Sequence, residues 1–208
     1  MKRCILLVSL FFFSFMLVGC NFMPNCGGII STESSSVEQG EEKSVYDKLN
    51  EMVVGINSFN LIVSTTSDVE TLTSNYSVTY CEDGYDIVYS YEAFNKLNLI
   101  GSQEDYKSVK SGTAKVVDGE IEESTGDEIN AIPDKLSLSF DKNYFSNVEE
   151  TTDSFSAKVI NGKAFLGTDK TVENMILTVQ YAESAFKEIE ITYSTSTSSV
   201  NLKYTFEK

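Results

Sequence analysis

The sequence predicts an α+β fold, mostly antiparallel β: a curved sheet or open half-barrel of about ten strands behind an amphipathic helix. Apolar residues recur at helical spacing in residues 44–57 and at a spacing of two from residue 58 onward. Polar residues alternate with the apolar ones, which is typical of antiparallel strands with one buried face and one solvated face. We therefore expect the N-terminal helix to pack on the concave face of the sheet.

The helix is predicted from its apolar face and its end signals. Ser44 can cap the first turn and Asp47 follows at the third helical position, whereas Gly55 weakens the helix and Asn57 ends it. The apolar residues that share one face are Val45, Leu49, Met52, Val53 and Ile56.

Eleven segments have the strand pattern, and residues 120–124 and 163–166 are the two weakest of them. The continuous Val and Ile runs of a parallel sheet are absent, and so is a glycine-rich phosphate loop, which disfavours a nucleotide-binding fold. The predicted strands are residues 58–66, 71–82, 84–93, 112–117, 120–124, 135–140, 153–160, 163–166, 173–181, 187–195 and 199–207.

Three dipeptides between strands tolerate the positive φ of type I′ hairpin turns. Residues 94–111 and 124–134 are the least regular, which makes them candidate rim loops, and residues 141–148 can hold one helical turn. The three dipeptides are Asp83-Gly84, Asp118-Gly119 and Asn161-Gly162.

Charge and composition exclude several functions. The 208 residues include 16 Lys and Arg against 31 Asp and Glu, a formal charge of −15 that repels phosphate backbones, so we expect no nucleic-acid partner. The chain contains no His, which removes Ser-His-Asp and Cys-His catalysis and imidazole ligation of metals. We expect no metal site and no cofactor.

Paired carboxylates are the one catalytic chemistry that needs neither His nor Cys. The acidic residues occur in runs with polar neighbours, as on solvated surfaces, so we expect no catalytic residue. A carboxylate-dependent hydrolase remains an alternative, with candidate acids Glu122, Glu123, Asp127, Glu128, Glu149 and Glu150.

The N-terminus has the pattern of an export signal. Lys2 and Arg3 precede an apolar run, residues 4–18, that is shorter than the ~20 residues of a membrane-spanning helix. The run ends at Leu17-Val18-Gly19-Cys20, which resembles the lipobox of bacterial lipoproteins. The resemblance implies cleavage between Gly19 and Cys20 and a diacylglyceryl thioether on Cys20. An ordinary signal peptide or a short uncleaved anchor is the alternative.

We therefore expect a signal peptide at residues 1–19, a lipidated flexible tether at 20–43 and one extracytoplasmic domain at 44–208. Two acyl chains would hold the protein on the cell membrane essentially permanently. Without the signal, 14 basic residues face 31 acidic ones, a formal charge of −17, so the lipid and not electrostatic attraction must hold it. Cys26 in the tether and Cys81 can either pair or remain free thiols.

The order of elements in residues 44–208, a helix and then a long antiparallel meander, resembles the lipoprotein carrier and acceptor superfamily. The resemblance implies an open half-barrel whose concave apolar face, covered by helices, holds acyl chains. A permanently tethered protein cannot shuttle, and the chain after residue 19 has no Arg. The resemblance therefore implies local lipid handling at most.

These observations favour a non-catalytic binding module for an apolar or amphipathic, lipid-like ligand. The alternative is a structural or protein-interaction module of the cell envelope without a cavity. Most Tyr and Phe residues lie on predicted strands, where cross-strand packing explains them. The candidate ligand-binding residues on the concave face are Phe59, Leu61, Val63, Tyr89, Leu177 and Val179.

Overall fold

The computed structural model describes residues 43–96, 107–129, 131–133, 136–167 and 171–206. They belong to one compact unit, Glu41–Lys208. The lipobox, the tether up to residue 42 and Cys26 therefore lie outside the described residues. All buried apolar residues identified lie between Val45 and Ile191, so we expect residues 41–208 to fold without the segment before them. No helix in the described part is long and apolar enough to cross a membrane.

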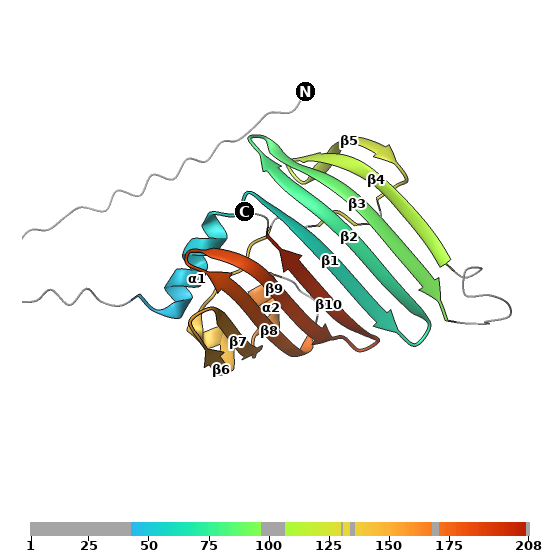
Figure 1. Cartoon of the computed structure of the whole chain (residues 1–208). Helices are drawn as coiled ribbons and strands as arrows, with labels where there is room; N and C mark the ends of the chain where they lie inside the picture. The colour runs from blue at the N-terminus through green and yellow to red at the C-terminus, as the bar shows by residue number, and fades with distance from the viewer. Residues whose placement is uncertain (1–42, 97–106, 130, 134–135, 168–170, 207–208) are drawn as a thin grey trace, which may run out of the picture. The chain divides into compact units, whose positions relative to one another are not determined.

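Ten strands form one open antiparallel sheet, in the order β5-β4-β3-β2-β1-β10-β9-β8-β7-β6 (Figure 1). The first and last strands pair at its centre, and the chain meanders from there to both edges. This confirms the predicted α+β class and antiparallel sheet. The strands are β1 (Ser58–Ser67), β2 (Glu70–Cys81), β3 (Gly84–Asn95), β4 (Lys107–Val117), β5 (Glu120–Gly126), β6 (Phe145–Glu150), β7 (Ser154–Val159), β8 (Glu173–Ala182), β9 (Ala185–Ser194) and β10 (Ser198–Thr205).

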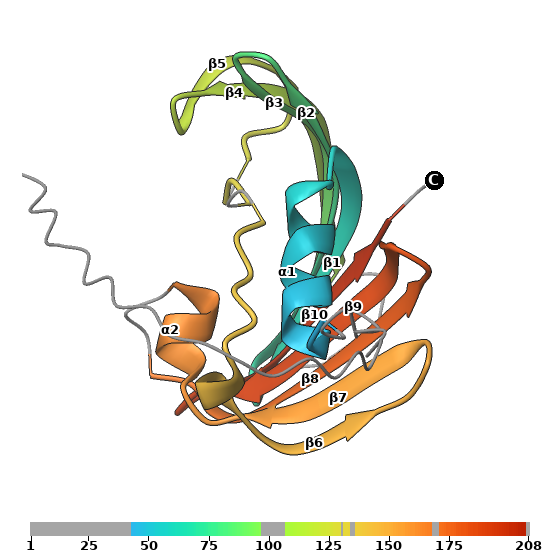
Figure 2. The same cartoon turned by 90° about the vertical axis from the view of Figure 1, so that its left-hand side faces the viewer.

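The predicted helix is α1 (Val45–Val54), and it lies on the concave side of the curved sheet (Figure 2). Ser44 Oγ accepts a hydrogen bond from the backbone N–H of Asp47 at 3.3 Å, and Gly55 ends the helix. Its buried residues are Val45, Leu49 and Met52, on the face that the sequence predicts.

A cluster of phenylalanines fills the concave side next to β6 and β7. The ring of Phe145 has its centroid 5.5 Å from that of Phe155 and 5.5 Å from that of Phe165, and Phe140 lies 6.4 Å from Phe155. Edge-to-face contacts of this kind are the favoured geometry of aromatic pairs. This part of the concave face is therefore a packed core.

Residues 136–140, predicted as part of a strand at 135–140, pair with no other strand. With residues 127–129 and 131–133 they form an extended segment, here called the strap, that crosses the concave side (Figure 2). Leu136, Leu138 and Phe140 are buried and alternate with exposed serines, which is the pattern that predicts a strand. The strand prediction was wrong because a spacing of two reports one buried face, not a strand partner.

The predicted strand at residues 163–166 is instead the helix α2 (Gly162–Leu166). Asn161-Gly162 is thus not a hairpin turn: Asn161 Oδ1 caps the helix by accepting from the N–H of Ala164 at 3.3 Å. Gly167, with φ of 62°, ends it. Asn and Gly suit helix ends as well as turns, so this dipeptide alone does not distinguish a hairpin turn from the start of a helix.

Other boundaries also differ from the prediction. The weak candidate at 120–124 is a strand, β5, and β4 begins at Lys107, inside the stretch expected to be irregular. The helical turn expected at 141–148 is the short 3₁₀ helix η2 (Lys142–Tyr144), and β6 follows it directly.

Of the other two predicted hairpin turns, one forms at the predicted dipeptide and the other is displaced by one residue. Asp118-Gly119 turns with positive φ at both residues, 52° and 81°, as expected. The other turn is formed by Glu82 and Asp83, and Gly84 already lies in β3. A Cβ at Gly84 would meet the carbonyl oxygen of Val116 at 2.0 Å, so glycine serves close strand packing there and not the turn.

Candidate functional site

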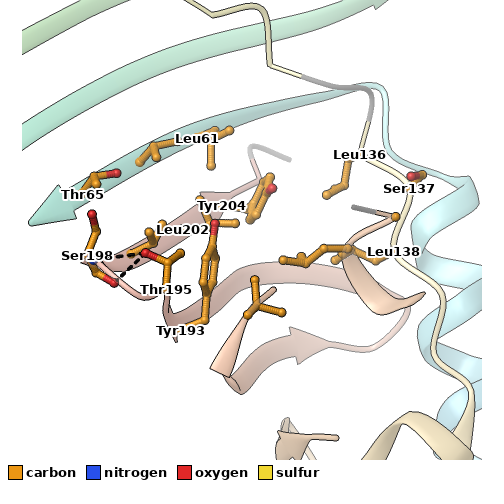
Figure 3. Close-up of a pocket in the computed structure, with 15 residues that line it drawn as sticks. Leu61, Thr65, Leu136, Ser137, Leu138, Tyr193, Thr195, Ser198, Leu202 and Tyr204 are labelled. Carbon is orange, nitrogen blue, oxygen red and sulfur yellow. Dashed lines mark hydrogen bonds between the residues drawn. The ribbon is translucent and has the colours of Figure 1, made fainter. Parts of the chain in front are cut away.

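A pocket of about 720 Å³ opens on the concave side of the sheet (Figure 3). Strands β1, β10 and β9 form its floor, and the strap and the end of α2 border it. The fifteen lining residues are Leu61, Val63, Thr65, Leu136, Ser137, Leu138, Leu166, Gly167, Val172, Tyr193, Thr195, Ser198, Val200, Leu202 and Tyr204.

The strand register brings the floor residues together. Val63 of β1 lies opposite Leu202 of β10, and Thr65 lies opposite Val200. Val200 in turn faces Tyr193 of β9. Since side chains two apart share a face, residues from the two ends of the domain form one continuous surface.

The floor is incompletely covered by protein. Three apolar floor residues are only partly buried: Val63, Val200 and Leu202. The phenylalanine cluster, in contrast, is buried. Leu136 and Leu138 of the strap, both 8% exposed, border the pocket on the side of α1 (Figure 3). The pocket is therefore a place where apolar surface remains available for a further molecule.

Tyrosine hydroxyls from β2 and β3 fasten the strap over the sheet. Tyr80 Oη accepts from the N–H of Leu136 at 2.9 Å, and Tyr85 Oη donates to the carbonyl of Pro133 at 3.1 Å. Tyr91 Oη donates to the carbonyl of Glu128 at 2.9 Å, and Tyr89 Oη donates to that of Asp127. These contacts satisfy backbone groups that a strand would have paired.

The pocket has a hydroxyl-bearing end and a leucine end. Thr65, Thr195 and Ser198 lie together at the β9–β10 turn, away from the strap leucines (Figure 3). Thr195 Oγ1 accepts from the N–H of Ser198 at 3.1 Å, which fixes the turn. None of the described residues that line the pocket carries a charge.

Tyr193 projects from β9 into the pocket (Figure 3). Burial raises the pKa of its phenol, because desolvation disfavours the phenolate. The hydroxyl therefore stays protonated near neutral pH and can donate a hydrogen bond.

The predicted ligand-binding residues divide into two groups. Leu61 and Val63 line the pocket. The other four are almost wholly enclosed by protein: Phe59 and Tyr89 are each 2% exposed, and Leu177 and Val179 are each 0% exposed.

Sequence reasoning missed most of the lining. Tyr193, Val200 and Leu202 show the same alternation as Leu61 and Val63, so the pattern marked them as facing one side. What the sequence does not display is the pairing of β1 with β10, which selects these residues from all the alternating ones.

The candidate catalytic carboxylates do not converge. Glu122 lies on β5 and Glu149 on β6, and these strands are the two opposite edges of the sheet. Asp127 is engaged with the backbone, since its Oδ2 accepts from the N–H of Ser111 at 2.9 Å. None of the six candidate acids lines the pocket.

Within the described ranges, no group of three or more Cys, Asp or Glu side chains is placed to hold a metal ion. Cys81 is exposed at the end of β2 and forms no disulfide with any residue that the structure describes. These residues add no reactive group to the pocket.

No protein-family model matches the sequence, and neither the curated proteins nor the solved structures contain a match. A function for this chain therefore has to be inferred from its pocket and its N-terminal motif.

Proposed function

We propose that this chain is a bacterial lipoprotein, anchored through Cys20 on the extracytoplasmic side of the cell membrane. Its domain, residues 44–208, binds an apolar or amphipathic, lipid-like ligand without transforming it. The observation that carries the proposal is the partly apolar pocket of about 720 Å³ on the concave face.

The size and lining of the pocket support ligand binding. Sites that enclose small molecules measure about 300–1,000 Å³ and combine apolar walls with a few polar groups. Val63, Val200 and Leu202 supply the apolar floor, and a ligand that covers them gains roughly 25 cal/mol for each Å² of apolar surface removed from water. A protein-interaction module without a cavity does not need such a pocket.

The pocket chemistry supports binding and not catalysis. Its hydroxyls belong to Ser, Thr and Tyr, and no lining residue is an acid or base that could activate them. A hydroxyl nucleophile without an adjacent base reacts poorly.

The N-terminal motif supports the anchor. Lys2 and Arg3, the apolar run and Leu17-Val18-Gly19-Cys20 are in the order that lipidation and cleavage require. With a formal charge of −17 after cleavage, the chain does not adhere to anionic lipid without its acyl chains. The bilayer is thus the expected partner through the acyl chains alone.

Labelled palmitate tests the anchor. We expect it to incorporate into the full chain and not into Cys20→Ser, which should remain unprocessed. No label in the wild-type chain, or processed Cys20→Ser that stays on the membrane, would contradict lipid anchoring.

Binding of N-phenyl-1-naphthylamine, a neutral apolar dye that fluoresces in apolar sites, tests the pocket. Residues 41–208, purified without detergent, should bind it saturably with a stoichiometry near one. An absence of saturable binding would overturn the ligand-binding proposal and favour a module without a ligand.

A further inference from the structure

The lining of the pocket is uncharged in a strongly charged protein. Of the whole chain 23% is charged, with a formal charge of −15, and yet none of the fifteen described lining residues is Asp, Glu, Lys or Arg.

An ionised headgroup would bind poorly in such a site. A charge that leaves water without an opposite charge to pair with loses its hydration energy uncompensated. A negative headgroup is disfavoured for a second reason, because the net negative charge of the protein repels it.

Polar contacts are nevertheless available inside the pocket. Thr65 and Ser198 place hydroxyls at the end of the pocket near the β9–β10 turn, where the hydroxyl of Thr195 is already hydrogen-bonded within the turn. Tyr193 stands between this end and the strap leucines (Figure 3). Among the described residues the hydroxyl of Tyr193 has no hydrogen-bond partner, so it can pair with a ligand oxygen.

We propose that the pocket selects an uncharged, hydroxyl-bearing amphiphile, of the monoacylglycerol type. Its headgroup lies at Tyr193, Thr65 and Ser198, and its chain runs toward Leu136 and Leu138. This inference rests on the proposed ligand-binding function and specifies its ligand class.

A matched pair of lipids tests the ligand class. 1-Monooleoylglycerol and 1-oleoylglycerol-3-phosphate share the glycerol and the acyl chain and differ in the phosphate. Each is added below its aggregation concentration to residues 41–208 carrying bound N-phenyl-1-naphthylamine. The uncharged lipid should displace the dye at a concentration at least about tenfold lower, the ratio expected when a buried charge lacks a partner.

A lysine placed inside the pocket should change this preference. Val63 lies on the pocket side of β1, and Ile62 lies on the opposite, exposed side. Val63→Lys and Ile62→Lys therefore add the same charge to the protein, but only Val63→Lys adds it on the pocket side. Val63→Lys should lower the ratio of the two displacing concentrations, phosphate lipid over uncharged lipid, about tenfold. Ile62→Lys should leave this ratio nearly unchanged. Thr65→Lys, with Thr66→Lys as its control, replaces the first pair if circular dichroism shows that Val63→Lys is unfolded.

The outcomes separate the two proposals. If the dye binds and both lipids displace it equally, the ligand class is wrong and the binding function stands. Equal effects of the pocket lysine and the surface lysine would also contradict the inference, since the preference would then come from net charge alone. If neither dye nor lipid binds, both proposals fail.

Discussion

The side chain of Asn50 forms two hydrogen bonds with the backbone of Phe140, 90 residues further along the chain. Its Oδ1 accepts from the N–H at 2.9 Å, and its Nδ2 donates to the carbonyl oxygen at 3.1 Å. A carboxamide can imitate the paired donor and acceptor of a neighbouring strand. Asn50 therefore joins α1 to the strap that borders the pocket.

Asn50→Ala should destabilise the domain by about 1–3 kcal/mol, because it leaves the N–H and C=O of Phe140 without partners next to a buried ring. Urea denaturation of residues 41–208 measures the change. Lys48→Ala, an exposed position on the same helix, should stay within about 0.5 kcal/mol of the wild type. Equal stability of the two variants would mean that the Asn50 contacts contribute nothing.

Tyr80→Phe should loosen the strap while keeping the aromatic ring. It removes the acceptor for the N–H of Leu136, so the exchange of that amide hydrogen with solvent should accelerate and stability should fall by about 1–3 kcal/mol. Tyr144→Phe is the matched control, since its hydroxyl has no hydrogen-bond partner among the described residues. Unchanged exchange at Leu136 in Tyr80→Phe would show that the strap is held without this bond.

Alkaline pH should destabilise the fold through its buried tyrosines. Burial raises the pKa of Tyr80 and of Tyr193 above the ordinary value of about 10. The unfolded chain then loses these protons first, so the stabilisation is complete below about pH 10 and is lost as pH rises through the higher folded-state pKa. Urea midpoints between about pH 8 and pH 11 should fall less steeply in Tyr193→Phe than in the wild type. Parallel curves would contradict a raised pKa at Tyr193.

Features that depend on local sequence were predictable. The helix α1 carries its own cap at Ser44 and its own apolar face, and both are where the sequence predicts them. The helix ends at Val54, with Gly55 as its cap, a few residues before the predicted end at Asn57. Asp118-Gly119 turns as expected, because both residues tolerate positive φ.

Features that depend on residues far apart in the chain were not predictable from the sequence. Leu136, Leu138 and Phe140 alternate like a strand, but the N–H groups of Leu136 and Phe140 are bonded to side chains of β2 and α1. The pocket floor needs the pairing of Val63 with Leu202, which joins the beginning and the end of the domain. Hydrophobic alternation predicts which face a residue takes and not which strand lies beside it.

Filling the pocket with a large side chain tests the central claim most directly. Val200 lines the pocket, and its neighbour Ser199 is exposed on the opposite face of β10. In residues 41–208, Val200→Trp should weaken N-phenyl-1-naphthylamine binding at least about tenfold, the effect of losing roughly 1.4 kcal/mol of contact. Ser199→Trp should bind like the wild type. Undiminished binding by a folded Val200→Trp variant would contradict ligand binding in this pocket.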